Sequence, residues 1–491
     1  MPALSFLIPA GADGIARTAL MENLALCSGP SGDAFPELTI RSLEGNILMA
    51  RSEGTESCHV LAPWSIPGKG MVLLKSATLI AEYSPFRLLV ELARGKIHQV
   101  SSIVSDMSYR GLRIGHEAPA LISKANQSFA MALSASTDED ANNLAHESIR
   151  LSSEAAEAYL ADYQAHLMGL KAQSAANTGT VFSFTLRGVL PNPDQTAILR
   201  SAFTGVSISL PWAKLQPAKG AINWEPLDSS LAWARSHGFS VTIGPILSPD
   251  AGLVPSWLSD SRQDVNQVAG HIARYVDQIL KRYCGMGFNG RFNIINSGNV
   301  SHFGDFSEDE MLRLSWHALD AAKQVDCRNE ITMGIRQPWG EIMGVEAREH
   351  NPANYLDTLV RSVGIISAIE LETLSGSIVG STHPKDMLDY HRLPELYYGI
   401  SQKPMKVVLA FPANHSDTFA VSKQSGDIAF DERVFRLGSI YAASPYVNEV
   451  RWHQIFDDDP GGVPGAGLFN TDGKPNRVLH SFVRLGKGLK P

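Results

Sequence analysis

The chain has 491 residues, of which 44% are hydrophobic and 19% are charged, so it has enough apolar material for a large core and for two or three domains. Its 42 basic and 50 acidic residues give a formal net charge of -8, which argues against a nucleic-acid partner, because such partners favour a basic face. No apolar run approaches the roughly 18 residues of a membrane span, and the N-terminal stretch lacks the basic residues of a secretory signal.

The four cysteines, Cys27, Cys58, Cys284 and Cys327, lie far apart and do not have the spacing of metal ligands. We expect four reduced thiols and a cytoplasmic protein, since no signal peptide is recognisable. No cofactor and no metal are expected. The oligomeric state cannot be predicted from these features.

Residues 1–135 are predicted to form a β-rich, sandwich-like module. Their short apolar or alternating runs are separated by clusters of Gly, Pro and Ser, which is typical of strands joined by turns. These runs begin at Leu38, Asn46, Met71 and Phe86. Trp64 lies among them and is expected to pack in the core or at an edge rather than to stack on a sugar.

Residues 136–178 are predicted to be a helical connector, because apolar residues from Leu144 to Leu170 recur at steps of three to five, mostly the period of one helix face. From residue 179 to 491 short apolar runs alternate with amphipathic helical stretches. Eight runs are strand candidates, and they begin at Val181, Gly205, Ser240, Phe292, Ile331, Ile366, Lys406 and Val447. Eight such units in about 310 residues predict a (β/α)8 TIM barrel rather than a doubly wound sheet, since no Gly-rich phosphate turn follows the first strand.

Glutamates follow two neighbouring strands of the predicted barrel. Glu341 lies in the loop after the fifth strand, and Glu370 and Glu372 end the sixth strand on one side of it. Adjacent strands are roughly 5 Å apart, so Glu341 and Glu372 could approach the separation of a retaining glycosidase pair. We predict Glu372 as nucleophile or base and Glu341 as acid. The alternative is that Glu341 lies on a surface loop and that an arginine or backbone amides hold Glu372.

Six further side chains near the predicted strand ends are candidates for substrate binding: Asn296, Trp339, Trp452, Trp212, Glu370 and His453. Of the tryptophans at strand ends, Trp212 and Trp257 are favoured as core residues. Each of His302, His383, His415 and His453, taken alone, is more typical of a structural or solvent-facing histidine than of a general base. The acidic run 457–459 is favoured as a solvated turn over a cation site.

Four segments in the correct order resemble the family-ten glycoside hydrolases, the xylanases. Residues 209–224 are similar to that family's second-strand signature, and residues 244–257 are similar to its third-strand segment. Residues 292–297 resemble its fourth strand, which ends in Asn-Glu, and residues 452–475 resemble its eighth strand and closing segment. Residues 91–96 and 337–341 also resemble uncharacterised bacterial proteins described as family-ten-like. Over residues 180–485 the resemblance implies a glycosidase-type barrel and a carbohydrate ligand.

The chain departs from this pattern at the family's catalytic positions. Ser297 stands where the family has its acid/base glutamate, and the seventh strand has Leu409 in the region of the nucleophile. The family's third-strand histidine is replaced by Pro245 and its second-strand lysine by Pro211. The inherited mechanism is therefore absent.

Two hypotheses of different classes follow. The first is a glycoside hydrolase that acts on an oligo- or polysaccharide through a relocated carboxylate pair, Glu341 and Glu372. The second is an inactive barrel that serves as a carbohydrate-binding or assembly protein, as the loss of the carboxylate at Ser297 suggests. Non-glycosidic barrel chemistry is a third possibility, with less support because no phosphate or metal signature occurs.

Overall fold

The computed structural model describes residues 3–488 except 11, 13, 29–34, 53–56, 68, 174–178, 251, 262–263, 301–304, 376–384 and 413–429. Eight strands form a closed barrel in which every neighbouring pair is parallel. The strands are β9 (Val181–Leu186), β10 (Gly205–Ile208), β11 (Ser240–Ile243), β12 (Arg291–Ile295), β13 (Glu330–Arg336), β14 (Ile366–Leu374), β15 (Met405–Ala410) and β16 (Val447–Trp452). All eight predicted strands and the predicted TIM barrel are confirmed, and the doubly wound sheet is excluded.

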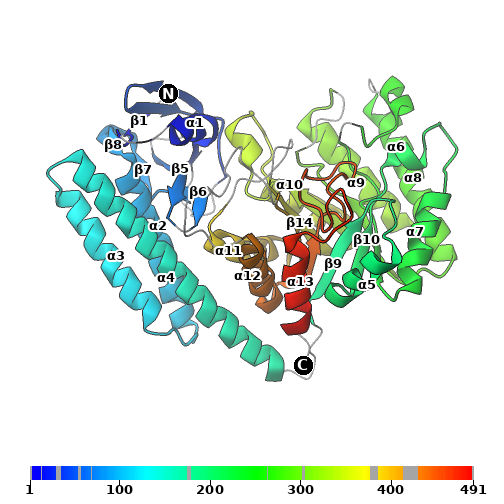
Figure 1. Ribbon diagram of the computed structural model, residues 1–491. Helices are drawn as coiled ribbons and strands as arrows, with labels where there is room; N and C mark the ends of the chain where they lie inside the picture. The colour runs from blue at the N-terminus through cyan, green and yellow to red at the C-terminus, as the bar shows by residue number, and fades with distance from the viewer. Residues whose placement is uncertain are drawn as a thin grey trace.

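A helix of ten or more residues follows each barrel strand and covers the outside of the barrel (Figure 1). These helices are α5 (Pro193–Ala202), α7 (Glu225–Ser236), α8 (Val265–Gly285), α9 (Glu308–Gln324), α10 (Pro352–Val363), α11 (Met387–Ser401), α12 (Phe430–Ala443) and α13 (Arg477–Gly488). Side-chain and backbone signals set several of their starts. Asn192 and Ser307, for example, each accept a hydrogen bond from a backbone amide of the first helical turn in a capping box.

Two four-stranded sheets form the N-terminal part, as the β-rich prediction required. One contains β1 (Ala3–Leu7), β3 (Ile40–Glu44), β4 (Ile47–Arg51) and β8 (Phe86–Arg87), and the other contains β2 (Ala25–Ser28), β5 (Ser57–Ile66), β6 (Gly70–Lys75) and β7 (Leu79–Ile80). Helix α1 (Gly14–Asn23) joins β1 to β2. Trp64 packs against the core of this part, as predicted.

Helices replace the predicted strand at Phe86 and continue to residue 134. After the two residues of β8 the chain forms α2 (Leu88–Tyr109) and α3 (Glu117–Ser134), and then α4 (Asp138–Gln173), which confirms the predicted long helix. The run of Leu88, Leu89 and Val90 is buried in a helix because its apolar neighbours continue at helical spacing to Val104. A short apolar run by itself does not distinguish a strand from a buried helix.

Helices α2 and α4 pack against the barrel as well as against α3 (Figure 1). Val100 of α2 and Tyr159 of α4 share one buried cluster with Leu388 of α11 and Ile440 of α12. A buried ion pair reinforces this contact, since the Lys96 ammonium lies 2.9 Å from a carboxylate oxygen of the residue that caps α11, Asp386. The module limits at 135 and 178 stay predictions. Among the described helices, none has the length and apolar character that crossing a bilayer requires.

The cysteines correct the expectation of four reduced thiols. Cys284, near the end of α8, forms a disulfide with Cys327, in the loop before β13. Cys27 and Cys58 are free and buried, and burial raises the pKa of the Cys27 thiol to about 12. Sequence spacing did not indicate this pair, because 43 residues separate its members and α9 lies between them.

Acidification should destabilise the fold through His391 of α11. This ring is buried against Tyr163 of α4 at 4.4 Å between ring centroids, and burial lowers its pKa to about 4. The unfolded chain would bind a proton near pH 6.5, so the stabilisation from neutral His391 is complete above that pH and is lost as the pH falls towards 4. We expect a loss of about 3 kcal/mol from this group over that range, measured by urea unfolding at stepped pH.

His391→Phe should flatten that part of the profile of unfolding free energy against pH. An unchanged profile in the variant would contradict this role.

Candidate functional site

A cavity of about 400 Å³ opens at the carboxyl ends of the barrel strands. Its walls include Arg187 directly after β9, residues 209–212 after β10, four residues after β11 (Pro245, Ile246, Ser248 and Asp250) and Asn296 after β12. Active sites of TIM barrels form at this end, on the loops that follow the strands. The lining is unusually charged. It includes Asp250, Glu370, Glu372, Arg187, Arg336 and Arg451.

Arg336 and Glu372 form the centre of a network of charged and polar side chains at the rim of the cavity. Glu372 is almost fully buried, and one carboxylate oxygen accepts a hydrogen bond from the Arg336 Nε at 2.9 Å while the other accepts from the Asn296 Nδ2 at 2.6 Å. The Arg336 Nη1 lies 3.2 Å from a carboxylate oxygen of Asp250. Burial alone would lower the pKa of Arg336, but the carboxylates of Glu372 and Asp250 outweigh it and raise that pKa. The network therefore holds Glu372 in one orientation facing the cavity.

Ser297, the residue after Asn296, holds Asp250 in place. Its φ of 54° is in the left-handed region, which a serine adopts only at a cost, and its hydroxyl donates to the Asp250 carboxylate at 2.9 Å. Beside it, the Asn296 Oδ1 accepts from the Ser248 hydroxyl at 2.5 Å. The two residues directly after β12 thus position a carboxylate of β14 and a carboxylate of the loop after β11.

A second network lies deeper in the barrel. Arg451 of β16 donates from Nη1 to Glu370 at 2.9 Å and from Nη2 to Glu449 at 2.7 Å. Glu449 also accepts from the Ser183 hydroxyl at 2.6 Å and lies 3.4 Å from the Lys406 ammonium. Burial alone would raise the pKa of Glu449, but Arg451 and Lys406 hold it well below its usual range. Charged side chains therefore fill space in which TIM barrels usually pack Val, Ile and Leu.

His453 and Arg187 complete the wall where the barrel closes between β16 and β9. An Arg187 Nη2 lies 2.7 Å from the His453 Nε2, so this ring nitrogen accepts the hydrogen bond and the imidazole is neutral. Burial, and then the charges of Arg187 and Arg336, hold the pKa of His453 well below its usual value. His453 is thus unsuited to donate a proton near neutral pH.

The structure brings four of the eight predicted site residues to the cavity wall with their polar groups engaged there. They are Glu372, Glu370, Asn296 and His453. Trp212 also borders the cavity, but its indole stacks on Tyr275 at 4.5 Å and its Nε1 donates to Gln216.

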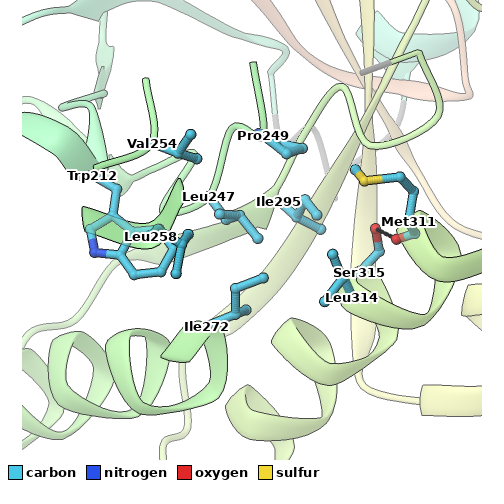
Figure 2. A pocket seen from close by; sticks show the side chains of 10 residues that line it. All are labelled: Trp212, Leu247, Pro249, Val254, Leu258, Ile272, Ile295, Met311, Leu314 and Ser315. Atoms are coloured by element: carbon cyan, nitrogen blue, oxygen red, sulfur yellow. Dashed lines mark hydrogen bonds between the residues drawn. The ribbon is translucent and has the colours of Figure 1, made fainter. Parts of the chain in front are cut away.

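Figure 2 shows the Trp212 side chain in a second, apolar pocket, near Leu258 and Leu247. This pocket has a volume of about 10 Å³, which is too small for a ligand and barely enough for one water molecule. The Trp212 indole is therefore a core side chain in this structure.

Trp452 and Trp339 lie outside the lining of the main cavity. Trp452 follows Arg451 in β16, and because side chains alternate along a strand it points away from the barrel axis. On the outside of the barrel its ring packs on Phe482 of α13 and its Nε1 donates to the Ala466 carbonyl. Trp339 packs edge-to-face on Tyr390 at 5.3 Å and carries the Lys385 ammonium over its ring at 5.2 Å.

Glu341 also lies outside that lining, in a short 3-10 helix, η3 (Glu341–Gly344). Its carboxylate pairs with the Lys385 ammonium at 3.1 Å. Lys385 forms a backbone bridge with Leu73 of β6, and the Gly344 carbonyl accepts from the Thr39 amide, so this loop lies where the barrel meets the N-terminal sheets. Among the described residues, the ion-pair and hydrogen-bond partners of Glu341 differ from those of Glu372, and their catalytic pairing stays a prediction.

Three of the histidines considered, His302, His383 and His415, lie outside the described residues. In the acidic run 457–459, Asp459 accepts hydrogen bonds from the amides of Ile455 and Phe456, and Asp457 accepts from the amide of Gly467. These carboxylates therefore brace the loop after β16.

Four charged residues of the cavity wall were not among the predicted site residues: Arg187, Asp250, Arg336 and Arg451. The prediction rested on groups that transfer protons and on aromatic rings. Each of the four residues lies at or just beyond a predicted strand, or in the loop after it, so a search for charged groups of both signs at strand ends would have found them.

Comparisons with known proteins agree with a glycosidase-like barrel. Residues 197–284 match the family model for the beta-galactosidases of glycoside hydrolase family 42. The matched segment runs from α5 to α8 and covers less than half of the chain. No curated protein matches the chain.

Among solved structures, the chain is similar to xylanase 10B from Thermotoga maritima at 13% identity and a TM-score of 0.47, with 63% of this chain and 96% of that one covered. Xylanase 10B from Thermotoga petrophila, in complex with xylobiose, matches at 13% identity and a TM-score of 0.48, with coverages of 64% and 96%. Native xylanase 10C from Cellvibrio japonicus matches at 12% identity and a TM-score of 0.46, covering 64% and 72%. Sequence identities of 12–13% do not extend the substrates of these xylanases to this chain.

Proposed function

We propose that the cavity binds an oligo- or polysaccharide and that the protein hydrolyses it with Glu372 as nucleophile or base. The observation that carries this proposal is the fixed position of Glu372, which two donors orient at the wall of a 400 Å³ cavity at the carboxyl end of the barrel. Hydroxyl-rich ligands need several positioned donors and acceptors, and Asn296, Ser248 and Arg336 supply them here.

Asp250 is the second carboxyl in this proposal. It and Glu372 bind nitrogens of one planar guanidinium, so the bonded oxygens lie within roughly 9 Å of each other. That bound is compatible with the separation of about 5–5.5 Å in retaining enzymes and of about 6.5–9.5 Å in inverting enzymes. Glu341, the partner predicted from the sequence, is the alternative second carboxyl.

One observation favours the second candidate, a saccharide-binding barrel without turnover. Each carboxyl that lines the described cavity, Asp250, Glu370 or Glu372, is paired with an arginine. Glycoside cleavage needs one protonated carboxyl beside the scissile bond. A ligand that displaces Arg336 from Asp250 would allow the Asp250 carboxyl to take up a proton. A ligand that leaves the carboxylate–arginine pairs intact would be bound and released unchanged.

A saccharide panel tests the function directly. We expect a subset of oligosaccharides to raise the melting temperature and to release new reducing ends. Leu253→Trp places an indole at the cavity wall and should weaken binding at least tenfold, while Val345→Trp adds the same ring at an exposed position away from the cavity. Binding without new reducing ends would support the non-catalytic candidate. Equal binding by the natural protein and Leu253→Trp would remove the cavity from the function.

A further inference from the structure

The three arginines of the cavity differ in their partners. Arg336 is bound by Asp250 and Glu372, and Arg451 is bound by Glu370 and Glu449. Arg187 has no carboxylate within ion-pair distance among the described residues, and the side chain that it contacts there is that of His453. It is thus the arginine of the described lining that forms no ion pair, and the carboxylates of Asp459, Glu372 and Asp250 act on its charge only from beyond that distance.

Arg187 is also nearly buried. Its exposed fraction is 9%, and its Nε has no hydrogen-bond acceptor among the described residues. Burial lowers its pKa, yet an arginine in a protein keeps its proton, so a desolvated positive charge remains. His453 is neutral and does not compensate this charge. Leaving a buried charge without a partner is costly, and an anion at this position would remove that cost.

Arg187 borders the cavity that a ligand would enter. Arg187 and the glycines of the 461–462 turn line the same cavity, and a Cβ added at Gly461 would lie 3.7 Å from the Arg187 Nη1. The turn therefore brings backbone, without a side chain, close to this nitrogen. A planar guanidinium edge matches the paired oxygens of a carboxylate, a sulfate or a phosphate.

We propose that the ligand of this cavity is an acidic saccharide and that Arg187 binds its anionic group. This inference rests on the proposed function, because it assigns the class of saccharide that the same cavity takes. The anionic group is the shared chemistry, and a uronate carboxylate and a sulfate ester are its two sources.

The test compares ligands that have the same sugar backbone and differ in their anionic groups. Oligogalacturonate is measured against its methyl ester, and a sulfated oligosaccharide against its desulfated form, by calorimetry at two salt concentrations. We expect the charged member of one pair to bind at least tenfold more tightly, and its advantage to shrink at higher salt. Arg187→Met should abolish the advantage and leave the affinity for the neutral member within about twofold, and Arg187→Lys should keep part of it.

Arg361→Met, at an exposed helix position, is the matched control for losing one charge and should keep the full preference. The melting temperature of Arg187→Met should stay the same or rise, because an apolar residue replaces a buried unpaired charge. A fall of several degrees would instead show that Arg187 is structural and would overturn the inference. Equal binding of the charged and neutral members to the natural protein would overturn it while the proposed function stands. No binding of any saccharide would overturn both.

Discussion

Replacing Glu372 with glutamine should lower the rate of saccharide hydrolysis by about 10²–10⁴-fold. The amide oxygen can still accept the hydrogen bond from Asn296, but the side chain loses the charge that a nucleophile or base needs. The size of the side chain is unchanged, so the cavity should keep its shape. Initial rates on the best substrate of the panel, with melting temperatures measured alongside, provide the test.

Two further glutamine or asparagine changes identify the second carboxyl. Asp250→Asn should reduce the rate to a similar extent, because Asp250 lines the cavity and shares Arg336 with Glu372. Glu341→Gln should keep most of the activity, since that carboxylate pairs with Lys385 outside the cavity lining. Loss of activity in Glu341→Gln together with full activity in Asp250→Asn would establish the pair predicted from the sequence instead. Full activity in Glu372→Gln would exclude Glu372 from catalysis.

Replacing Arg451 with methionine should destabilise the protein by about 3–5 kcal/mol. The variant leaves Glu370 without its cation, and Glu449 keeps Lys406 as its nearest remaining one. Both carboxylates are almost fully buried in the natural protein, so they are poorly hydrated when the guanidinium is lost. Urea unfolding followed by intrinsic tryptophan fluorescence would measure the change.

The double variant Arg451→Met, Glu370→Gln separates lost pairing from lost packing. It removes one of the stranded charges, so we expect it to recover part of the lost stability. Arg361→Met removes a surface pair and should change the free energy of unfolding by less than about 1 kcal/mol. If Arg451→Met were no less stable than the natural protein, the buried network would not be what holds the inside of the barrel together.

The barrel could be predicted from the sequence because its signals are local. Runs such as 407–410 are continuously apolar, they are bounded by turns, and the stretches between them repeat at helical spacing. The N-terminal boundary between strand and helix was not predictable in this way. The run that begins at Phe86 fits the spacing of apolar residues in a strand as well as in a helix. In the structure its residues from Leu88 onward form the start of α2, which packs against α4.

The candidate site could be predicted in part. Glu372, Glu370, Asn296 and His453 were found because strand ends of a barrel meet at one rim, which is a consequence of topology. Trp452 ends a strand and Glu341 lies in the loop after one, yet the Trp452 side chain points outward and the loop of Glu341 lies against the N-terminal sheets. The side on which such a residue lies depends on strand register and loop path, which distant segments determine.

Local patterns in the chain were thus enough to determine the (β/α)8 architecture and the rim at which the strand ends of the barrel meet. The tertiary structure alone decided which charges meet. Arg336 lies far along the chain from Asp250, and Arg187 is even farther from His453, so no spacing rule connects them. Ion pairs across a closed barrel depend on the packing of all eight strands, and this packing leaves Arg187 as the arginine of the described cavity without a carboxylate partner.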